Sequence, residues 1–508
     1  MRFKLSNILK NSRLGTDHLW PLIVLAGFGF YTSLVPQVPN DLWWHLKIGE
    51  QIHTTGTVPT TALFTWVLPT NTPFTYGAWL AEYLFYGLYR LGGVNIVLTM
   101  RTVLALLAFG LVGYEAWRQG GSWRLASLAV VLAGLMSLNN LIARPQNWAW
   151  SLFMGFYILL GKYADGQLRR HWLLLCPLLM AFWVNVHGSF VLAPIMVGIF
   201  LMGEALRTWL KWSEALSWRD VKWLAIIEGL TLAATSANPQ FARIYGYVVN
   251  MMTDLPSQSL IVEWQSPTPE GIANITFFAS ILILLLVLAY TQYRPKPTEA
   301  LLIVAFLWLA WSGQRYVVWF AMIGMPFLVK VLSKLVPPRF FMAPSLRNRL
   351  NLVLALLLCI PVILAQPWFL NCLPLPETYW KLVLRDSEIG MPLSIATPVQ
   401  AVAYLEQHPG GHLFNEMGYG SYLIWAMPEQ GVFIDPRVEL YPYEQWLDYI
   451  RISDGVNYNE LLMNYNVDRI LLDLEKQKTL SELLAGDPLW EMEYHDSYAQ
   501  IWRRSSEE

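Results

Sequence analysis

The chain has 508 residues, of which 55% are hydrophobic and only 14% are charged. Soluble globular proteins carry about 25% charged residues, so this composition indicates a polytopic membrane protein and excludes an ordinary soluble enzyme. The net charge of −1 excludes the basic footprint of a nucleic-acid-binding protein.

The first predicted element is an apolar span over residues 19–38, which follows the basic residues Arg2, Lys4, Lys10 and Arg13. Because Lys and Arg favour the cytoplasmic side of a membrane, we expect a cytoplasmic N-terminus. No small-residue cleavage site follows the span, so we expect a retained transmembrane helix and not a removed signal peptide.

An acidic and aromatic segment, 39–45 (PNDLWWH), follows this span directly. An ionisable group near a bilayer is costly unless it is partnered or used, so Asp41 is the leading candidate for a catalytic residue. The alternative is that Asp41 caps a helix over 42–51. His45 lies one helical turn further along the same face, either as a second catalytic residue or as an ion-pair partner of Asp41.

The next apolar piece, 79–91, has about 13 residues, whereas a membrane crossing needs about 20. A crossing at this point would place the later basic clusters outside, so we expect an interfacial or re-entrant segment. The segment contains Glu82, a candidate substrate-binding residue of the external loop 39–93.

Further spans are expected along the rest of the membrane domain and bring the total to about 11. They lie at 94–117, 124–141, 147–161, 172–185, 188–206, 223–237, 273–291, 299–313, 316–333 and 350–370. Basic clusters then fall inside each time, and the other external loops are 142–146, 185–188 and 238–272.

The external ends of these spans carry polar side chains, whereas the cytoplasmic ends carry mostly Lys and Arg. Arg144 and Arg315 are candidates for binding a phosphate through the planar guanidinium fork, with snorkelling to lipid phosphates as the alternative. The remaining candidates for substrate binding are Asn185, His187, Glu263 and Trp264. For His187 the alternative is a structural bond to the backbone, and for Glu263 it is an ion pair.

Beyond residue 370 the composition shifts toward charged residues and alternating, strand-like runs. We expect strands at 411–415, 431–435 and 469–474, with a short helix at 419–427. The chain is therefore divided into a multi-span domain, 1–370, and an external soluble α/β domain, 371–508. Asp435 and Arg437 either contact a ligand at the end of the second strand or form a structural salt bridge.

Several of these features resemble the GT-C superfamily of membrane glycosyltransferases, especially the bacterial group related to protein mannosyltransferases and aminoarabinose transferases. They are Asp41 directly after the first span, the interfacial segment 79–91, the run Ala143-Arg144-Pro145-Gln146-Asn147, and an external C-terminal domain. The resemblance covers the architecture of the whole chain, although its motifs are short.

The resemblance implies a GT-C-like α-helical membrane protein that takes a sugar from a polyprenyl-phosphate-linked donor, with inversion at the anomeric carbon. Asp41 would be the general base on a hydroxyl of a glycan, lipid or protein acceptor, and Arg144 or Arg315 would hold the donor phosphate. Leu42 stands where the family typically has a second acid, so the sequence leaves a divalent metal open.

Two other functions remain open: a transporter or flippase of a lipid-linked sugar, and a non-catalytic membrane scaffold that kept the fold. Transporters usually place polar groups near the bilayer midplane and show internal repeats. Here the polar residues lie at one face and no repeat is visible, which favours the glycosyltransferase. We expect a multi-pass plasma (inner) membrane protein whose C-terminal domain is periplasmic or extracellular.

Overall fold

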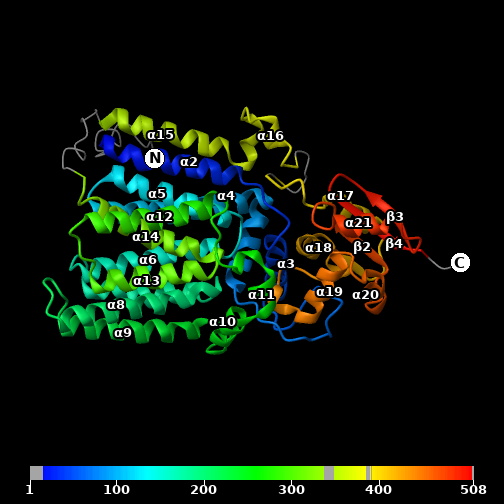
Figure 1. Cartoon of the computed structure of the whole chain (residues 1–508), viewed down its shortest axis with the longest axis horizontal. Coiled ribbons are helices and arrows are strands. Elements are labelled where there is room, and N and C mark those ends of the chain that lie inside the picture. Colours follow the sequence, from blue (N-terminus) through cyan, green and yellow to red (C-terminus); the bar gives the residue numbers. More distant parts are fainter. Residues whose placement is uncertain (1–14, 337–347, 385–389, 391, 506–508) are drawn as a thin grey trace. The chain divides into compact units, whose positions relative to one another are not determined.

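The computed structural model describes residues 15–336, 348–384, 390 and 392–505 (Figure 1). The chain forms two compact units, each assembled from three segments of the sequence. Unit 1 consists of Met1–Val35, Leu98–Ile244 and Val262–Leu373, and unit 2 consists of Pro36–Val97, Tyr245–Ile261 and Pro374–Glu508. The basic N-terminal residues that predict the orientation lie outside the described residues.

Unit 1 is a bundle of apolar helices that lie side by side (Figure 1). Its helices are α2 (Leu19–Leu34), α5 (Trp123–Met136), α6 (Gln146–Ala164), α7 (Leu175–Trp183), α8 (Leu192–Trp209), α9 (Trp218–Ala234), α12 (Gly271–Tyr290), α13 (Pro297–Ser312), α14 (Val317–Leu332) and α15 (Asn348–Leu364). A helix coincides with each predicted span of this unit. Among the short 3-10 turns that adjoin these helices are η3 (Arg170–Leu174) before α7, η4 (Gly188–Val191) before α8 and η7 (Gln314–Tyr316) before α14.

Within the described part of the chain, four helices are long and apolar enough to cross a membrane by themselves. They are Trp79–Gly120, Gly188–Trp209, Gly271–Tyr290 and Gln314–Leu332, and several shorter apolar helices pack beside them. These helices make the chain an integral membrane protein, while the total of about 11 spans stays a prediction.

The helix α4 (Trp79–Gly120) consists of two helical segments that meet at a kink. Gly93 has φ 66° and ψ −161°, a backbone conformation that is essentially restricted to glycine. The segment before the kink belongs to unit 2, and the chain enters unit 1 at Leu98. The predicted separation of 79–91 from the span 94–117 therefore corresponds to a real break in the helix.

Unit 2 contains a four-stranded sheet with the strand order β1-β2-β4-β3. The strands are β1 (Leu413–Asn415), β2 (Arg469–Asp473), β3 (Trp490–His495) and β4 (Ala499–Arg504). β1 runs parallel to β2, whereas β4 is antiparallel to both β2 and β3. The accompanying helices are α3 (Leu42–Thr55), α10 (Arg243–Thr253), α11 (Leu255–Leu260), α16 (Glu377–Trp380), α17 (Val399–Gln407), α18 (Met417–Ala426), α19 (Tyr443–Ser453), α20 (Tyr458–Asn464) and α21 (Lys478–Leu484).

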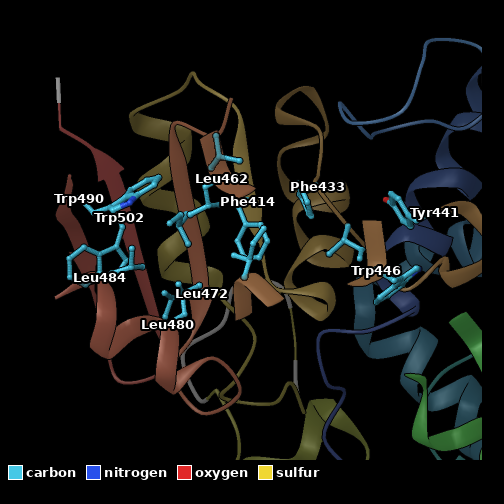
Figure 2. Close-up of a cluster of buried hydrophobic side chains, with 14 of the residues drawn as sticks. Phe414, Phe433, Tyr441, Trp446, Leu462, Leu472, Leu480, Leu484, Trp490 and Trp502 are labelled. Atoms are coloured by element: carbon cyan, nitrogen blue, oxygen red, sulfur yellow. The ribbon is translucent and has the colours of Figure 1, made fainter. Parts of the chain in front are cut away.

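The core of unit 2 combines residues of the C-terminal region with residues of the loop after α3. Figure 2 shows Phe414, Phe433, Leu472 and Trp502 among the buried side chains of the C-terminal region. The loop residues Ala62, Trp66, Val67, Leu68 and Phe74 pack against the same cluster. The predicted division placed two consecutive domains on either side of residue 370. The observed division differs, because the loop after α3 packs with the C-terminal region.

Two of the three predicted strands correspond to β1 and β2, and the predicted helix 419–427 corresponds to α18. The predicted strand 431–435 is wrong, since this segment forms a single parallel bridge, between Val432 and Thr65. Its backbone therefore pairs with the loop after α3 and not with the sheet. The strands β3 and β4 were not predicted.

Candidate functional site

Asp41 stands at the start of α3, in unit 2. Its backbone is helical (φ −46°, ψ −35°), and its carbonyl accepts the first helical hydrogen bond, from His45 N, at 3.2 Å. The Asp41 side chain makes no capping hydrogen bond, so the alternative of a capping carboxylate is not what the structure shows. The carboxylate is half-buried.

The cap of α3 comes instead from Ser421, on α18 in the C-terminal region. The Ser421 hydroxyl accepts a hydrogen bond from Trp44 N at 3.2 Å and donates one to the Asn40 carbonyl. Gly418 of α18 allows this close approach, since a Cβ there would lie 2.5 Å from the Pro39 carbonyl oxygen. The C-terminal region therefore fixes the helix that carries Asp41.

His45 contacts Glu82 across the two helices α3 and α4. The His45 Nδ1 atom lies 3.0 Å from Glu82 Oε1, and the two residues are 7% and 1% exposed. Gly49 makes this possible, because a Cβ there would come within 2.2 Å of the Glu82 carbonyl oxygen. Sequence reasoning offered Asp41 as the ion-pair partner of His45, and the structure shows Glu82 in that role.

A second buried pair, Asp435 and Arg437, lies in the same unit. Arg437 Nε and Nη2 donate to the two Asp435 oxygens at 2.8 and 2.7 Å. The remaining donors reach the loop after α3, with Nη1 3.2 Å from the Tyr76 hydroxyl and Nη2 2.9 Å from the Leu63 carbonyl oxygen. Of the two interpretations of this motif, the structure shows the salt bridge.

In unit 1, Arg144 and Glu263 form a bidentate ion pair. The guanidinium Nη1 and Nη2 donate to Glu263 Oε2 and Oε1 at 2.7 and 2.9 Å. Desolvation alone would raise the pKa of Glu263, but the Arg144 charge and its hydrogen bonds outweigh it and hold that pKa below its ordinary value. Glu263 is thus ionised at neutral pH and occupies the fork of Arg144.

Arg315 belongs to the short turn η7 and lies over the ring of Trp264, with its Cζ atom 4.3 Å from the ring centroid. Tyr316 packs edge-on against the same indole at 6.0 Å between centroids. Among the residues that the structure describes, no carboxylate forms a salt bridge with Arg315. Arg315 is therefore a positioned cation whose fork is not used by an acid.

His187 lies near both arginines at the turn before α8. Its Nδ1 accepts a hydrogen bond from Ser189 N at 3.0 Å, which is the backbone bond expected as the alternative to ligand binding. Burial lowers the pKa of His187 to about 3, and the charges of Arg315 and Arg144 add to the effect. The imidazole is therefore neutral at physiological pH, with its proton on Nε2.

Asn185, two residues earlier, uses its amide to hold the same turn. Its Nδ2 donates to the Ala181 carbonyl oxygen at 2.8 Å, and its Oδ1 accepts from Asn238 Nδ2 at 3.2 Å. The bond from Asn238 connects the turn to the start of the predicted external loop 238–272. These bonds give Asn185 a structural role that its position alone did not indicate.

The predicted site residues thus fall into two groups, one in each unit. Unit 2 brings together Asp41, His45 and Glu82, and unit 1 brings together Arg144, Asn185, His187, Glu263, Trp264 and Arg315. Sequence reasoning missed Ser421, Tyr76 and the aromatic neighbour Trp44. The run Gly418-Tyr419-Gly420-Ser421 in the first turns of α18 was the available signal for a close helix contact.

A divalent metal was left open by the sequence. Within the described ranges, no three His, Cys, Asp or Glu side chains gather into a set that could hold a metal ion. The buried acids of both groups are instead held by bases, Glu82 by His45 and Glu263 by Arg144. Among the residues that the structure describes, the donor set therefore does not fit a resident metal.

No family model matches the chain, and no curated protein sequence matches it. Solved structures do. The chain is similar to the oligosaccharyltransferase of Archaeoglobus fulgidus, with 15% identity and a TM-score of 0.53 over 90% of this chain and 70% of that one. It is also similar to the mycobacterial arabinofuranosyltransferase AftD, with 14% identity and a TM-score of 0.56 over 98% of this chain and 41% of that one.

A third similar structure is ArnT from Cupriavidus metallidurans, with 13% identity and a TM-score of 0.46 over 95% of this chain and 96% of that one. The two structures with TM-scores above 0.5 are both GT-C glycosyltransferases. The resemblance to the GT-C superfamily is confirmed at the level of the fold.

Proposed function

We propose that this integral membrane protein is a glycosyltransferase that moves a sugar from a polyprenyl-phosphate-linked donor to an acceptor hydroxyl. The GT-C fold supports a membrane glycosyltransferase as the general class. In the proposal the reaction is a single displacement with inversion, Asp41 is the general base, and the protein acts at the external face of the plasma (inner) membrane.

The observation that carries the proposal is the environment of Arg315. Its guanidinium lies over Trp264, near the neutral His187, and has no salt bridge with an acid in the described part of the chain. Glu263 neutralises one of the two arginines, so the group keeps a net positive charge. A phosphate suits this charge, because the guanidinium can donate two parallel hydrogen bonds to it.

Arg144 has a different part in the proposal, since its fork is already occupied by Glu263. We assign Arg315 to the donor phosphate and Arg144 to the orientation of Glu263. Trp264 then offers an aromatic contact to the sugar of the donor substrate, and Glu263 offers a hydrogen-bond acceptor to it. The His187 Nε2–H can donate a hydrogen bond to an anionic oxygen. Asn185 fixes the turn that carries His187.

Asp41 supports the proposal through its position in the chain and at the start of α3. Its side chain is not used to cap α3, it is half-buried, and it follows the first apolar helix, α2. A carboxylate in such a place can accept the proton of an alcohol as the alcohol attacks the anomeric carbon. The phosphate of the donor leaves on the opposite face of the sugar.

Binding of undecaprenyl phosphate by the purified chain in lipid nanodiscs tests this proposal. The variant Arg315→Gln keeps the length of the side chain and removes the charge, so we expect its affinity to fall roughly tenfold or more. The matched control is Arg219→Gln, since Arg219 is an exposed arginine of unit 1. Equal affinities of the wild type and Arg315→Gln would contradict the proposal.

A further inference from the structure

Among the buried polar atoms of unit 2 without a hydrogen-bond partner in the part of the chain that the structure describes, two belong to side chains that contact His45. They are Glu82 Oε2, a potential acceptor, and Trp44 Nε1, a donor. Glu82 is 1% exposed and Trp44 is 9% exposed. Buried polar atoms in native proteins nearly always have a partner, so this pair points to a group that comes from outside the chain.

The two atoms belong to side chains that both contact His45. The His45 ring lies against the Trp44 indole in a tilted arrangement, with 3.6 Å between the ring centroids, and its Nδ1 is 3.0 Å from the other oxygen of Glu82. The indole, the imidazole and the carboxylate are therefore contiguous. The close approach of α3 and α4 at Gly49 keeps them together.

The nearby cation, Arg437, does not supply the missing donor. Its Cζ atom is 5.8 Å from the centroid of the Trp44 ring. Its guanidinium donates to Asp435, to the Tyr76 hydroxyl and to the Leu63 carbonyl oxygen. These hydrogen bonds thus go to acceptors other than Glu82 Oε2.

We propose that Trp44, His45 and Glu82 form a subsite for a hydroxyl group of a sugar. The hydroxyl donates its hydrogen to Glu82 Oε2 and accepts one from the indole N–H of Trp44. His45 holds the carboxylate in place through its Nδ1. The subsite rests on the proposed function, in which this sugar is the acceptor, and it makes the acceptor a glycan.

The chemistry of the unpaired atoms selects this ligand. A hydroxyl is both donor and acceptor, as the pair requires. An ammonium group has no lone pair for the indole N–H, and a carboxylate or phosphodiester has no hydrogen to donate to Glu82 Oε2.

Ligand-observed NMR with the full chain in nanodiscs, which contain no sugar-based detergent, tests the subsite. The probes are the methyl pyranosides of glucose, galactose and mannose. We expect saturable binding of at least one of them, weakened about tenfold in Glu82→Gln, in which an amide N–H₂ takes the place of the acceptor oxygen. Trp44→Phe removes the N–H, keeps an aromatic ring and should weaken binding about threefold to tenfold.

Glu50→Gln is the matched control, because Glu50 lies on α3 with Trp44 and its carboxylate is paired with Lys47 at 2.6 Å. It should bind the glycosides like the wild type. No binding by any glycoside, or wild-type affinity in both Glu82→Gln and Trp44→Phe, would overturn the subsite. Binding of N-acetylserine methylamide in place of the glycosides would overturn the assignment to a sugar.

Arg315→Gln separates this subsite from the proposed function. If both hold, this variant loses affinity for undecaprenyl phosphate and keeps the affinity for the glycoside. If the proposed function alone fails, the wild type does not bind the lipid phosphate, yet the glycoside still binds in a manner that depends on Glu82. If the subsite alone fails, the lipid binds and the glycosides do not.

Discussion

At the scale of residues, Glu263 occupies the guanidinium fork of Arg144, and Arg315 forms no salt bridge within the described part of the chain. Arg144, Glu263 and Arg315 stood out because charged side chains at the ends of apolar spans are costly. That Glu263 occupies the fork of Arg144, and leaves Arg315 without an acid, depends on a contact between residues 119 positions apart. No periodicity in the sequence reports such a contact.

The same limit applies to His45. Helical spacing placed it on the face of Asp41, and the structure adds the contact with Glu82 on another helix. The spacing rule concerns neighbours within one helix, whereas Glu82 lies 37 residues further along the chain.

The Asp435–Arg437 pair gives a stability prediction at this scale. Both side chains are buried, at 0% and 2% exposure. Asp435→Asn would leave the buried Arg437 charge without its counter-charge, so we expect a loss of about 3–5 kcal/mol in the free energy of unfolding. Thermal unfolding monitored by tryptophan fluorescence measures this loss, and we expect a large fall in the midpoint temperature of the variant.

The control for this prediction is Glu482→Gln. Glu482 forms a solvent-exposed pair with Lys478 at 3.7 Å, and such pairs contribute little. The free energy of unfolding of this variant should change by about 0.5 kcal/mol or less. Its midpoint temperature should therefore stay within about a degree or two of the wild type. A similar midpoint for Asp435→Asn would mean that the buried pair does not hold unit 2 together.

At the scale of elements, helices followed the sequence closely and strands did not. Apolar runs long enough for helices coincide with the helices of unit 1. The segment 431–435 has the composition of a strand, but Val432 bridges to Thr65 and the edge of the sheet is formed by other segments. Tertiary pairing decides such cases, because a short apolar run fits several environments.

The contact of α3 with α4 at Gly49 gives an element-scale prediction. A Cβ at this position would lie 2.2 Å from the Glu82 carbonyl oxygen and 2.8 Å from Tyr86 Cβ. Gly49→Ala should therefore separate the helices and lower the free energy of unfolding by about 1–3 kcal/mol. Thermal unfolding of the purified variant measures this.

Gly87→Ala is the matched comparison on α4. A Cβ at Gly87 would meet no atom within 4 Å, and alanine favours a helix over glycine by about 1 kcal/mol. We expect this variant to be as stable as the wild type or slightly more stable. If Gly49→Ala behaved in the same way, the close approach of the two helices would not be required.

At the scale of the whole molecule, the GT-C resemblance was found from short motifs and the order of spans, and the structural likenesses confirm it for the fold. The grouping of residues 36–97 with 374–508 was not predictable in this way. It depends on Trp66 and Phe74 packing on a core formed more than 300 residues later. The capping of α3 by Ser421 is a consequence of the same packing.

The central claim, sugar transfer with Asp41 as the base, is tested most directly by a transfer assay. Purified chain is supplied with polyprenyl-phosphate-linked radiolabelled sugars and a glycan acceptor, and the labelled product is counted. We predict product with the wild type and with Glu50→Gln, and a rate at least about 100-fold lower with Asp41→Asn, which removes the base and keeps the shape. A wild-type rate in Asp41→Asn, or movement of the lipid-linked sugar across the bilayer without any product, would contradict the account.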